Sequence, residues 1–344
     1  MSDTVFIKNL TWEKVNELIA SHTEEIVSDQ LCATPLISVL VHTYQHAEYI
    51  QQCMEGILAQ KTAFAFEIVI GDDGSTDGAY SIVKEYQEKH PHKIRLLHST
   101  PNMGRYTGSG IINVIRSIRA CRGKYIAFIE GDDYWTSTLK LERQVSLLEE
   151  NPDYSASIHD VEIIGDWNGE EFIFDHGKNT LITFSEQLTD AAPLAFGSLI
   201  GKREVLADLP DWYLKTPYQD RFCMALLAST GPVIRIPEKL GVYRRHAGGI
   251  TASKEFYNFS TTARVWEMHW NCRNYFHPAG YEYYDRMMRR SIGQLLRASR
   301  RPSWNFKQLG MVMLMLLRMP PSQWWKTYKE LSAERLSAGN LSGH

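Results

Sequence analysis

Two clusters of acidic residues each follow an apolar run, and their side chains are the ones best suited to chemistry. The first cluster, Glu130-Gly131-Asp132-Asp133, comes directly after the run 125–129. Crowded carboxylates repel one another unless a cation neutralises them, and hard divalent ions such as Mg²⁺ or Mn²⁺ prefer oxygen ligands. The cluster therefore predicts a metal that bridges the protein to a diphosphate. The alternative is that Asp132 or Asp133 caps the following helix.

The second cluster is Asp72-Asp73-Gly74-Ser75-Thr76-Asp77, which follows the apolar run 66–70. Gly74 lets the backbone turn tightly, and a carboxylate at this point can accept a hydrogen bond from a nucleobase N–H. The alternative is a turn followed by a helix cap, for which Ser75, Thr76 and Asp77 are suitable. If the strands before the two clusters are parallel neighbours, both clusters face one cleft at the carboxyl edge of the sheet.

Apolar runs and helical patterns alternate along the first 150 residues. Strands are expected at 36–43, 66–70, 94–98 and 125–129, and helices at 47–60, 78–90, 108–120 and 138–150. This alternation predicts right-handed crossovers and an α/β fold with a mostly parallel sheet flanked by helices. Further on, strands are expected at 155–164, 196–201 and 233–236, a hairpin at 165–180, a helix from Asp220, and helices from about 255 onward.

Composition and charge narrow the class of protein. The 344 residues are 44% hydrophobic and 22% charged, as in soluble globular proteins. The first thirty residues carry acidic side chains and no uninterrupted apolar stretch, so a secretory signal is not expected. Five scattered cysteines with no Cys-x-x-Cys pair indicate neither a disulfide framework nor a zinc site. We therefore expect a cytoplasmic protein with reduced thiols.

The motifs, taken together, resemble family 2 of the inverting glycosyltransferases, which have the GT-A fold. The matching segments lie in the same order and at similar spacing across about residues 35–250: 38–44, 70–77, Asn102-Met103-Gly104, 123–133 and 241–246. The resemblance implies a Rossmann-like mixed sheet and transfer of a sugar from a nucleotide diphosphate donor. The resemblance covers the expected catalytic domain (35–250), and the helical patterns outside it predict an N-terminal helical extension (1–34) and a C-terminal helical, basic region (251–344).

The resemblance assigns roles to individual residues. Asp132 is expected to hold Mn²⁺ or Mg²⁺ as the last residue of the family's D-x-D motif, in which Glu130 replaces the first aspartate. Asp220 is expected to be the catalytic base, with a helix cap as the alternative. The donor is expected to contact Thr43, Tyr44, Asp72, Asp73, Asn102, Gly104, Gly131, Asp132, Asp133, Arg245 and His246.

The segment that carries Arg245 and His246 resembles the part of the family that closes over the donor, with Gly248-Gly249 as hinges. Its basic side chains are suited to the diphosphate, although a solvated basic loop is the alternative. The Gln-x-x-Arg-Trp motif and the membrane helices of processive relatives are not found in the sequence, so we expect one sugar per binding event. A uridine diphosphate sugar is the donor expected from the family.

The C-terminal part is basic. Residues 285–329 contain ten Lys or Arg against one Asp, a balance of +9 in a chain whose net charge is −3. Its longest apolar run, 309–317, is too short to span a bilayer, which needs about 20 residues. The mixture of cations with aromatic and aliphatic residues favours peripheral contact with a membrane, at its inner face, beside a lipid-linked acceptor. Packing on the catalytic domain or on a second subunit is the alternative.

The expected partners are thus a nucleotide diphosphate sugar and a glycan or lipid-linked glycan acceptor, as in surface polysaccharide or lipopolysaccharide assembly. No nucleic acid partner is expected, and homodimer formation stays open. Two other functions remain: a nucleotidyltransferase acting on sugar phosphates, whose glycine-rich phosphate loop is not found at residues 43–46, and a non-catalytic protein that binds nucleotide sugars.

Overall fold

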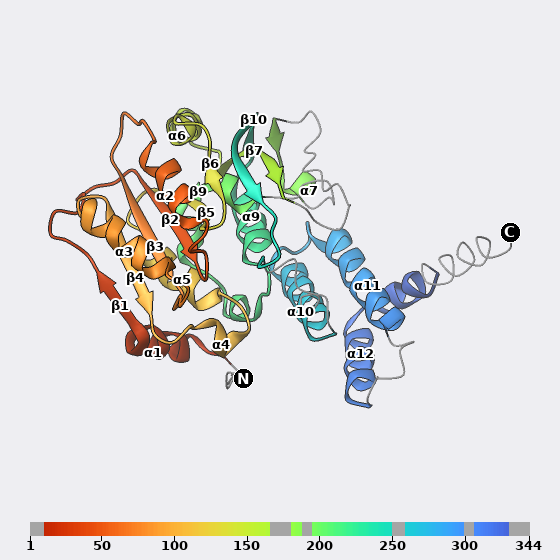
Figure 1. Ribbon diagram of the computed structural model, residues 1–344. Coiled ribbons are helices and arrows are strands. Elements are labelled where there is room, and N and C mark those ends of the chain that lie inside the picture. Colours follow the sequence, from red (N-terminus) through yellow and green to blue (C-terminus); the bar gives the residue numbers. More distant parts are fainter. Residues whose placement is uncertain (1–9, 166–179, 188–194, 250–258, 299–305, 330–344) are drawn as a thin grey trace, which may run out of the picture. The chain divides into compact units, whose positions relative to one another are not determined.

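Four apolar runs of the N-terminal half form parallel strands at the centre of one sheet. In spatial order they are β4 (Ile94–Ser99), β3 (Phe66–Asp72), β2 (Ile37–Thr43) and β5 (Tyr125–Glu130). Every residue of β2 and β3 is buried, because helices cover both faces, and this explains their mostly apolar sequence. The computed structural model describes residues 10–165, 180–187, 195–249, 259–298 and 306–329 (Figure 1).

Shorter and antiparallel strands extend this centre into a mixed sheet. On one side β1 (Thr23–Ile26) pairs antiparallel with β4. On the other side β9 (Ile200–Lys202) lies antiparallel between β5 and β7 (Ala156–Ile164), and β10 (Val233–Arg244) runs parallel to β7. Two short strands, β6 (Tyr134–Trp135) and β8 (Leu181–Ile182), pair antiparallel with β10. The sheet therefore has a parallel half that carries the acidic clusters and a mixed half.

Helices cover the two faces of the parallel half. The helices α2 (Ile50–Leu58), α3 (Ala79–Lys89) and α6 (Lys140–Glu150) pack their apolar stripes on one face. Helix α5 (Ile111–Ala120) covers the other face, where Ser117 and Asn113 lie so close to Gly71 that a Cβ on this residue would come within 2.6 Å of each. The other helical segments of this part of the chain are α1 (Trp12–His22), α4 (Gly104–Thr107), α7 (Phe184–Gln187), η1 (Phe196–Ser198), α8 (Arg203–Ala207), η2 (Asp211–Lys215) and α9 (Gln219–Thr230).

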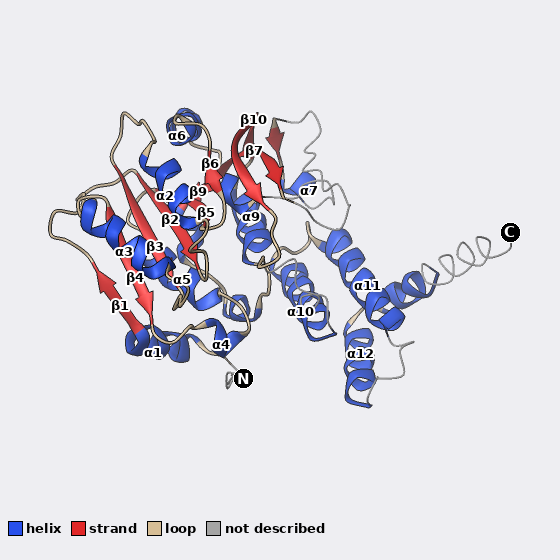
Figure 2. Ribbon diagram, in the orientation of Figure 1, coloured by secondary structure: helices blue, strands red, loops and turns tan. Residues whose placement is uncertain are grey.

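Contacts divide the chain into two compact units, Met1–Ala252 and Ser253–His344. In the second unit, α10 (Phe259–Tyr275), α11 (Tyr281–Ala298) and α12 (Phe306–Arg318) share a small apolar core that includes Trp266, Met288 and Met315. Figure 2 shows strands only in the first unit, and helices in both. None of the described helices combines the length and the apolar character that a membrane span requires.

Most expected elements are present within a few residues of their predicted bounds, and three predictions need correction. Residues 23–26, expected to belong to a helical extension, form the edge strand β1, because β4 offers them an unpaired edge. The run 196–201 begins with the 3₁₀ turn η1 and only ends in strand β9. The strand expected at 233–236 continues to Arg244 with irregular register. The hairpin expected at 165–180 lies almost entirely outside the described residues.

Candidate functional site

The two acidic clusters lie at the same edge of the sheet, where the parallel strands end. Thr43 pairs in register with Asp72, and His42 pairs with Glu130, so β2, β3 and β5 deliver their last residues side by side. On the far side of β3, Asp72 is in register with His98 of β4. Parallel strands place their carboxyl ends together, which is where ligands bind in open α/β sheets.

Asp132 follows β5 in a tight turn and faces two histidines. Its Oδ2 lies 3.0 Å from Nε2 of His246 and 3.8 Å from Nε2 of His46. The turn is held against β2 because the N–H of Gly131 donates to the carbonyl of His42 over 2.7 Å. Two imidazoles, from segments that are distant in sequence, therefore flank one oxygen of the Asp132 carboxylate.

Position 131 has little room for a side chain. A Cβ there would lie 2.9 Å from both His46 Nδ1 and Ile50 Cδ1, and 3.0 Å from Thr43 Oγ1. Thr43 Oγ1 and His46 Nδ1 are also buried without a hydrogen-bond partner in the part of the chain that the structure describes. The turn thus packs tightly beside polar atoms that still have bonding capacity.

The pKa values of Asp132 and Asp133 are shifted in opposite directions. Burial would raise the pKa of Asp132, but the hydrogen bond from His246 and the charge of His46 outweigh it and hold this pKa below its usual value. Burial raises the pKa of Asp133 well above its usual value, and the charge of Asp132 adds to the effect. Asp132 is therefore the more acidic carboxyl of the pair.

Arg244 ties the end of β10 to this turn. Its backbone N–H donates to Asp133 Oδ1 over 2.8 Å, and its guanidinium donates to the carbonyl of Asp132 and, over 2.7 Å, to Gln52 Oε1. The guanidinium also lies 4.6 Å from the ring centre of Tyr49. Because His246 follows only two residues later, these bonds fix the position from which its imidazole reaches Asp132.

Neither Asp132 nor Asp133 caps the next helix. Helix α6 has Leu139 at its N-cap and no side-chain cap bond. The helix-cap alternative is therefore wrong for this cluster.

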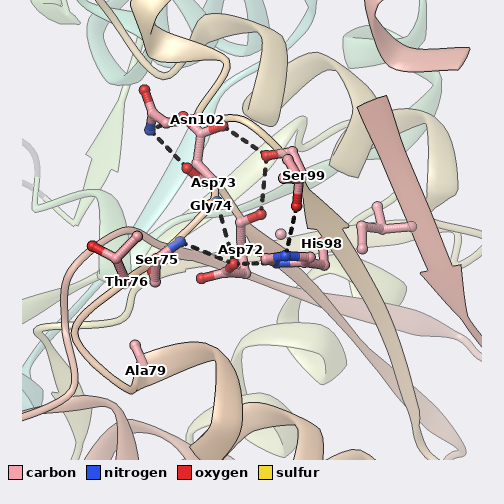
Figure 3. A network of polar contacts seen from close by, with 12 residues as sticks. Asp72, Asp73, Gly74, Ser75, Thr76, Ala79, His98, Ser99 and Asn102 are labelled. Carbon is pink, nitrogen blue, oxygen red and sulfur yellow. Dashed lines mark hydrogen bonds and ion pairs between the residues drawn. The ribbon is translucent and has the colours of Figure 1, made fainter. Parts of the chain in front are cut away.

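Asp72 is completely buried, and only one of its carboxylate oxygens is engaged (Figure 3). Oδ2 accepts the backbone N–H groups of Gly74 and Ser75, each over 3.2 Å, and lies 2.7 Å from Nδ1 of His98. Gly74 has a φ of 76°, a conformation that glycine adopts without strain. Oδ1 has no partner among the described residues, so it retains its capacity to accept a hydrogen bond.

Asp73 holds the loop that follows β4. Its carboxylate accepts Ser99 Oγ (3.1 Å), Asn102 Nδ2 (3.0 Å) and the backbone N–H groups of Met103 (2.8 Å) and Gly104 (3.3 Å). Burial raises its pKa, while these hydrogen bonds oppose the shift. Asn102 and Gly104 therefore lie directly beside the second acidic cluster, and Asp73 acts as their anchor.

The remaining residues of this cluster tie the loop after β2 to the loop after β3. The backbone N–H of Gln45 donates to Ser75 Oγ over 3.0 Å, and that of Ala47 donates to Asp77 Oδ2 over 2.8 Å. Asp77 also accepts the N–H of Ala79, so the turn alternative describes this residue correctly. Tyr44 is exposed between these fixed points, with 46% of its surface accessible, and is free to meet a ligand.

Asp220 lies in the first turn of α9 and does not cap it, because the N-cap residue is Tyr218. Burial raises the pKa of Asp220, the backbone N–H and charge of Arg221 oppose this, and the charge of Glu130 raises it further. Glu130 is therefore within electrostatic reach of Asp220. The helix-cap alternative is wrong here as well.

Arg245 and His246 follow β10 directly. The backbone N–H of Arg245 donates to the carbonyl of Ile164 at the end of β7, over 2.9 Å. The His246 ring lies against Tyr49, with 4.7 Å between ring centres. The segment up to Gly249 is thus anchored at its start by Arg244, Arg245 and His246.

Among the described residues, no group of three or more His, Cys, Asp or Glu side chains has the geometry of a preformed metal site. The donor chemistry at Asp132 nevertheless fits a divalent ion. An anionic oxygen faces an imidazole nitrogen at hydrogen-bond distance, so an ion could take the place of the shared proton. The other ligands would have to come from a diphosphate or from water.

The comparisons with known proteins agree with this geometry. The model of "Glycosyl transferase family 2" matches residues 38–208, which include both acidic clusters. Residues 38–208 of this chain are a glycosyl transferase family 2 domain. An uncharacterized protein of Mycobacterium tuberculosis is 31% identical over 243 residues, which are 67% of this chain and 64% of that relative. The resemblance inferred from the motifs is therefore confirmed.

Solved structures show that the family 2 domain has the GT-A type of fold. TarS of S. aureus, in complex with UDP-GlcNAc, is similar with a TM-score of 0.56 at 18% identity, over 81% of this chain and 79% of that chain. The mannosyltransferase PcManGT of Pyrobaculum calidifontis, in complex with GDP-Man and Mn²⁺, is similar with a TM-score of 0.52 at 16% identity, over 95% of this chain and 92% of that one.

Sequence reasoning about the family 2 domain missed four residues of this site: His46, His98, Arg244 and Tyr49. His46 lies two residues after Tyr44, in a segment where the sequence assigned only Thr43 and Tyr44 to the donor. His98 is the last residue of the strand predicted at 94–98, and the strand predicted before it leads to Asp72. Two neighbouring parallel strands end at the same edge of the sheet, so this pattern could have indicated His98. The sequence predicted Arg245 as the donor contact and not Arg244, because sequence does not show which of two adjacent arginines faces a site.

Proposed function

We propose that this family 2 protein transfers a single sugar from a nucleotide diphosphate sugar to an acceptor hydroxyl, with inversion at the anomeric carbon. The observation that carries the proposal is the contact between Asp132 and His246, at the sheet edge where Asp72 also ends its strand. This arrangement combines an anionic metal ligand with a buried carboxylate that has a free oxygen. These are the two features that a diphosphate and a nucleobase require.

Asp220 is proposed as the general base. In direct displacement the acceptor oxygen attacks the anomeric carbon, the bond from that carbon to the diphosphate oxygen breaks, and the proton of the acceptor passes to a carboxylate. Burial and the charge of Glu130 raise the pKa of Asp220, which makes it a better proton acceptor than an exposed aspartate. The effect of the Glu130 charge on Asp220 supports a position of Asp220 close to the proposed donor site.

Asp132 and His246 are proposed to hold the metal, with Glu130 as a further oxygen donor nearby. A bound divalent cation neutralises the charge that develops on the departing diphosphate. An imidazole in the donor set favours Mn²⁺ over Mg²⁺, because transition metals accept nitrogen ligands more readily. Manganese is present in the complex of the Pyrobaculum mannosyltransferase, which supports this choice.

The nucleoside is proposed to lie over Thr43, Tyr44 and Asp72, with Asn102 and Gly104 beside the donor. Asp72 Oδ1 is suited to accept the N–H of a uracil ring, since it is buried and has no partner among the described residues. TarS has been solved with UDP-GlcNAc, in agreement with a uridine donor. Arg245 and His246 would contact the diphosphate.

The acceptor is proposed to be a glycan or a lipid-linked glycan, in the assembly of a surface polysaccharide or lipopolysaccharide at the inner face of the cytoplasmic membrane. The basic region 285–329 would bring the protein to that membrane.

The decisive experiment combines donor binding with turnover. Wild-type protein with Mn²⁺ is screened by thermal shift against UDP-, GDP- and dTDP-sugars, since a bound ligand raises apparent stability by mass action. Release of nucleoside diphosphate is then measured with and without oligosaccharide and lipid-linked acceptors. Acceptor-dependent release by the wild type, absent in Asp132→Asn, supports the proposal. Stabilisation by a donor without release in any acceptor assay would favour a non-catalytic binding protein, and formation of pyrophosphate from sugar phosphate and nucleoside triphosphate would favour a nucleotidyltransferase.

A further inference from the structure

Helix α12 is apolar on two opposite faces. One face, with Val312, Met315 and Met319, packs into the small core that α12 shares with α10 and α11. The opposite face carries Met313, Leu314 and Leu317, which are 58%, 63% and 65% exposed. A helix that is apolar all round is normally buried on all sides, so the exposed face of α12 is expected to have a partner.

The next helical segment, residues 321–329, also has one buried and one exposed face. Gln323 and Thr327 are buried at helical spacing, while Trp325 and Tyr328 are exposed and stack on each other with 5.5 Å between ring centres. Lys329 lies over the Trp325 ring. Aromatic residues of this kind, apolar at one end and polar at the other, are enriched at membrane–water interfaces.

The charge of this region selects the partner. Residues 286–329 contain no Asp or Glu, and the cations Arg318, Lys326 and Lys329 are exposed beside the exposed apolar residues. A symmetric contact between two copies would bring these cations close to one another, and like charges at an interface cost affinity. An anionic lipid surface offers phosphate to the cations and a hydrocarbon boundary to the leucines.

We propose that α12 and residues 321–329 bind the surface of a membrane rich in anionic lipid. The α12 surface consists of Leu309, Met313, Leu314, Leu317, Trp325 and Tyr328, which enter the interface, together with Arg318, Lys326 and Lys329, which contact phosphate headgroups. Helix α11 is not part of it, because its apolar residues Met288, Ile292 and Leu295 are buried in the shared core. The proposal therefore narrows the membrane-binding region from the whole of 285–329 to its second half.

This surface is independent of the proposed sugar transfer, because vesicle binding requires neither donor nor acceptor. The full chain is floated with vesicles of phosphatidylcholine alone and of phosphatidylcholine with phosphatidylglycerol, at low and high salt. Binding is expected only with phosphatidylglycerol and is expected to weaken as salt rises. The triple variant Arg318→Gln, Lys326→Gln, Lys329→Gln is expected to bind about 100-fold more weakly, since each cation near such a surface contributes about fivefold.

The double variant Leu314→Glu, Leu317→Glu tests the apolar contribution and is expected to abolish flotation. Val27→Glu is the matched control, because Val27 is also an exposed apolar residue (46%) but lies outside the α12 surface. Circular dichroism of each variant verifies that the helices are intact. Failure of the wild type to float with anionic vesicles would overturn the proposal. Equal flotation of the wild type and the double variant would also overturn it. If the wild type does not float but forms a concentration-dependent dimer in sedimentation, and the double variant loses this dimer, the partner of the surface is a second copy of the chain and the proposal is wrong.

Discussion

The imidazole of His246 lies 3.0 Å from the carboxylate of Asp132, although 114 positions separate the two residues in the sequence. The contact exists because β10 runs parallel to β7, and Arg244 at the end of β10 bonds to the turn after β5. The proposed metal site thus depends on two halves of the sheet, one parallel and one mixed.

Removing this imidazole should weaken metal binding. His246→Ala is expected to reduce the affinity for Mn²⁺ in the presence of UDP by at least about tenfold, the lower end of the cost of losing even an outer partner of a metal ligand. Isothermal titration of Mn²⁺ measures the effect. His92→Ala is the matched control, because His92 is an exposed histidine before β4. Equal Mn²⁺ affinity in His246→Ala and wild type would remove His246 from the site.

Replacing the proposed base should affect turnover and leave donor binding intact. Asp220→Asn is expected to lower kcat by about 10²–10⁴-fold, the usual contribution of general-base catalysis, with an unchanged dissociation constant for the donor. Asp211→Asn, an exposed aspartate in η2, serves as the control. Wild-type turnover in Asp220→Asn, with donor binding unchanged, would exclude Asp220 as the base.

The pH dependence of turnover should report the environment of Asp220. A base is active only when deprotonated, so kcat/KM falls as pH drops through its pKa. Because burial raises the pKa of Asp220, this fall is expected at higher pH than for an ordinary aspartate, whose pKa is about 3.9. A profile that stays flat down to pH 4 in the wild type would contradict the assignment. The residual activity of Asp220→Asn is expected to lack this limb.

His98 should orient Asp72 for the nucleobase. His98→Leu removes the donor that lies 2.7 Å from Asp72 Oδ2 and is expected to weaken UDP binding by roughly tenfold, because hydrogen bonds to charged groups contribute about 1.5 kcal/mol or more. His98→Asn can place an amide N–H near the former Nδ1 and is expected to retain most of the affinity. Titration of both variants with UDP makes the comparison. Equal affinities in the two variants would show that the hydrogen bond has no role in binding.

His159 should make the protein sensitive to acid for a structural reason. Burial, with a contribution from the charge of Lys140, lowers the pKa of His159 to about 3. The unfolded chain binds a proton near pH 6.5 and the folded chain does not, so stability is lost as pH falls below about 6.5, by about 1.4 kcal/mol per pH unit. His159→Asn can still donate to the carbonyl of Asp160 and is expected to lose less stability between pH 7 and pH 5. Urea denaturation at the two pH values tests this, and identical losses would contradict it.

Local patterns were sufficient to predict the parallel half of the sheet. The runs that became β2, β3 and β5 are mostly apolar, as buried parallel strands require because helices cover both of their faces. Gly74 and Gly131 marked the turns after the runs that became β3 and β5, and crossover handedness then required the carboxylates to meet at one edge. The positions of Asp72 and Asp132 relative to the sheet followed from these rules.

The mixed half could not be predicted in the same detail. The pairing of β9 between β5 and β7, and the length of β10, depend on contacts between residues that are distant in sequence and carry no local period. The edge strand β1 formed where a helix was expected, since hydrogen bonds to β4 outweigh the weak preference of a four-residue segment.

The sequence by itself determined the family, the parallel strands and the two acidic clusters, because each depends on neighbouring residues in the chain. Only the tertiary structure decided which oxygen of Asp72 stays unpaired, which arginine ties β10 to Asp132, and that His46 and His246 flank the same carboxylate. Arg244 and His246 lie 112 and 114 positions from Asp132, and the packing of β10 and α2 against the sheet edge sets these contacts. Local residue patterns contain no information about such distances.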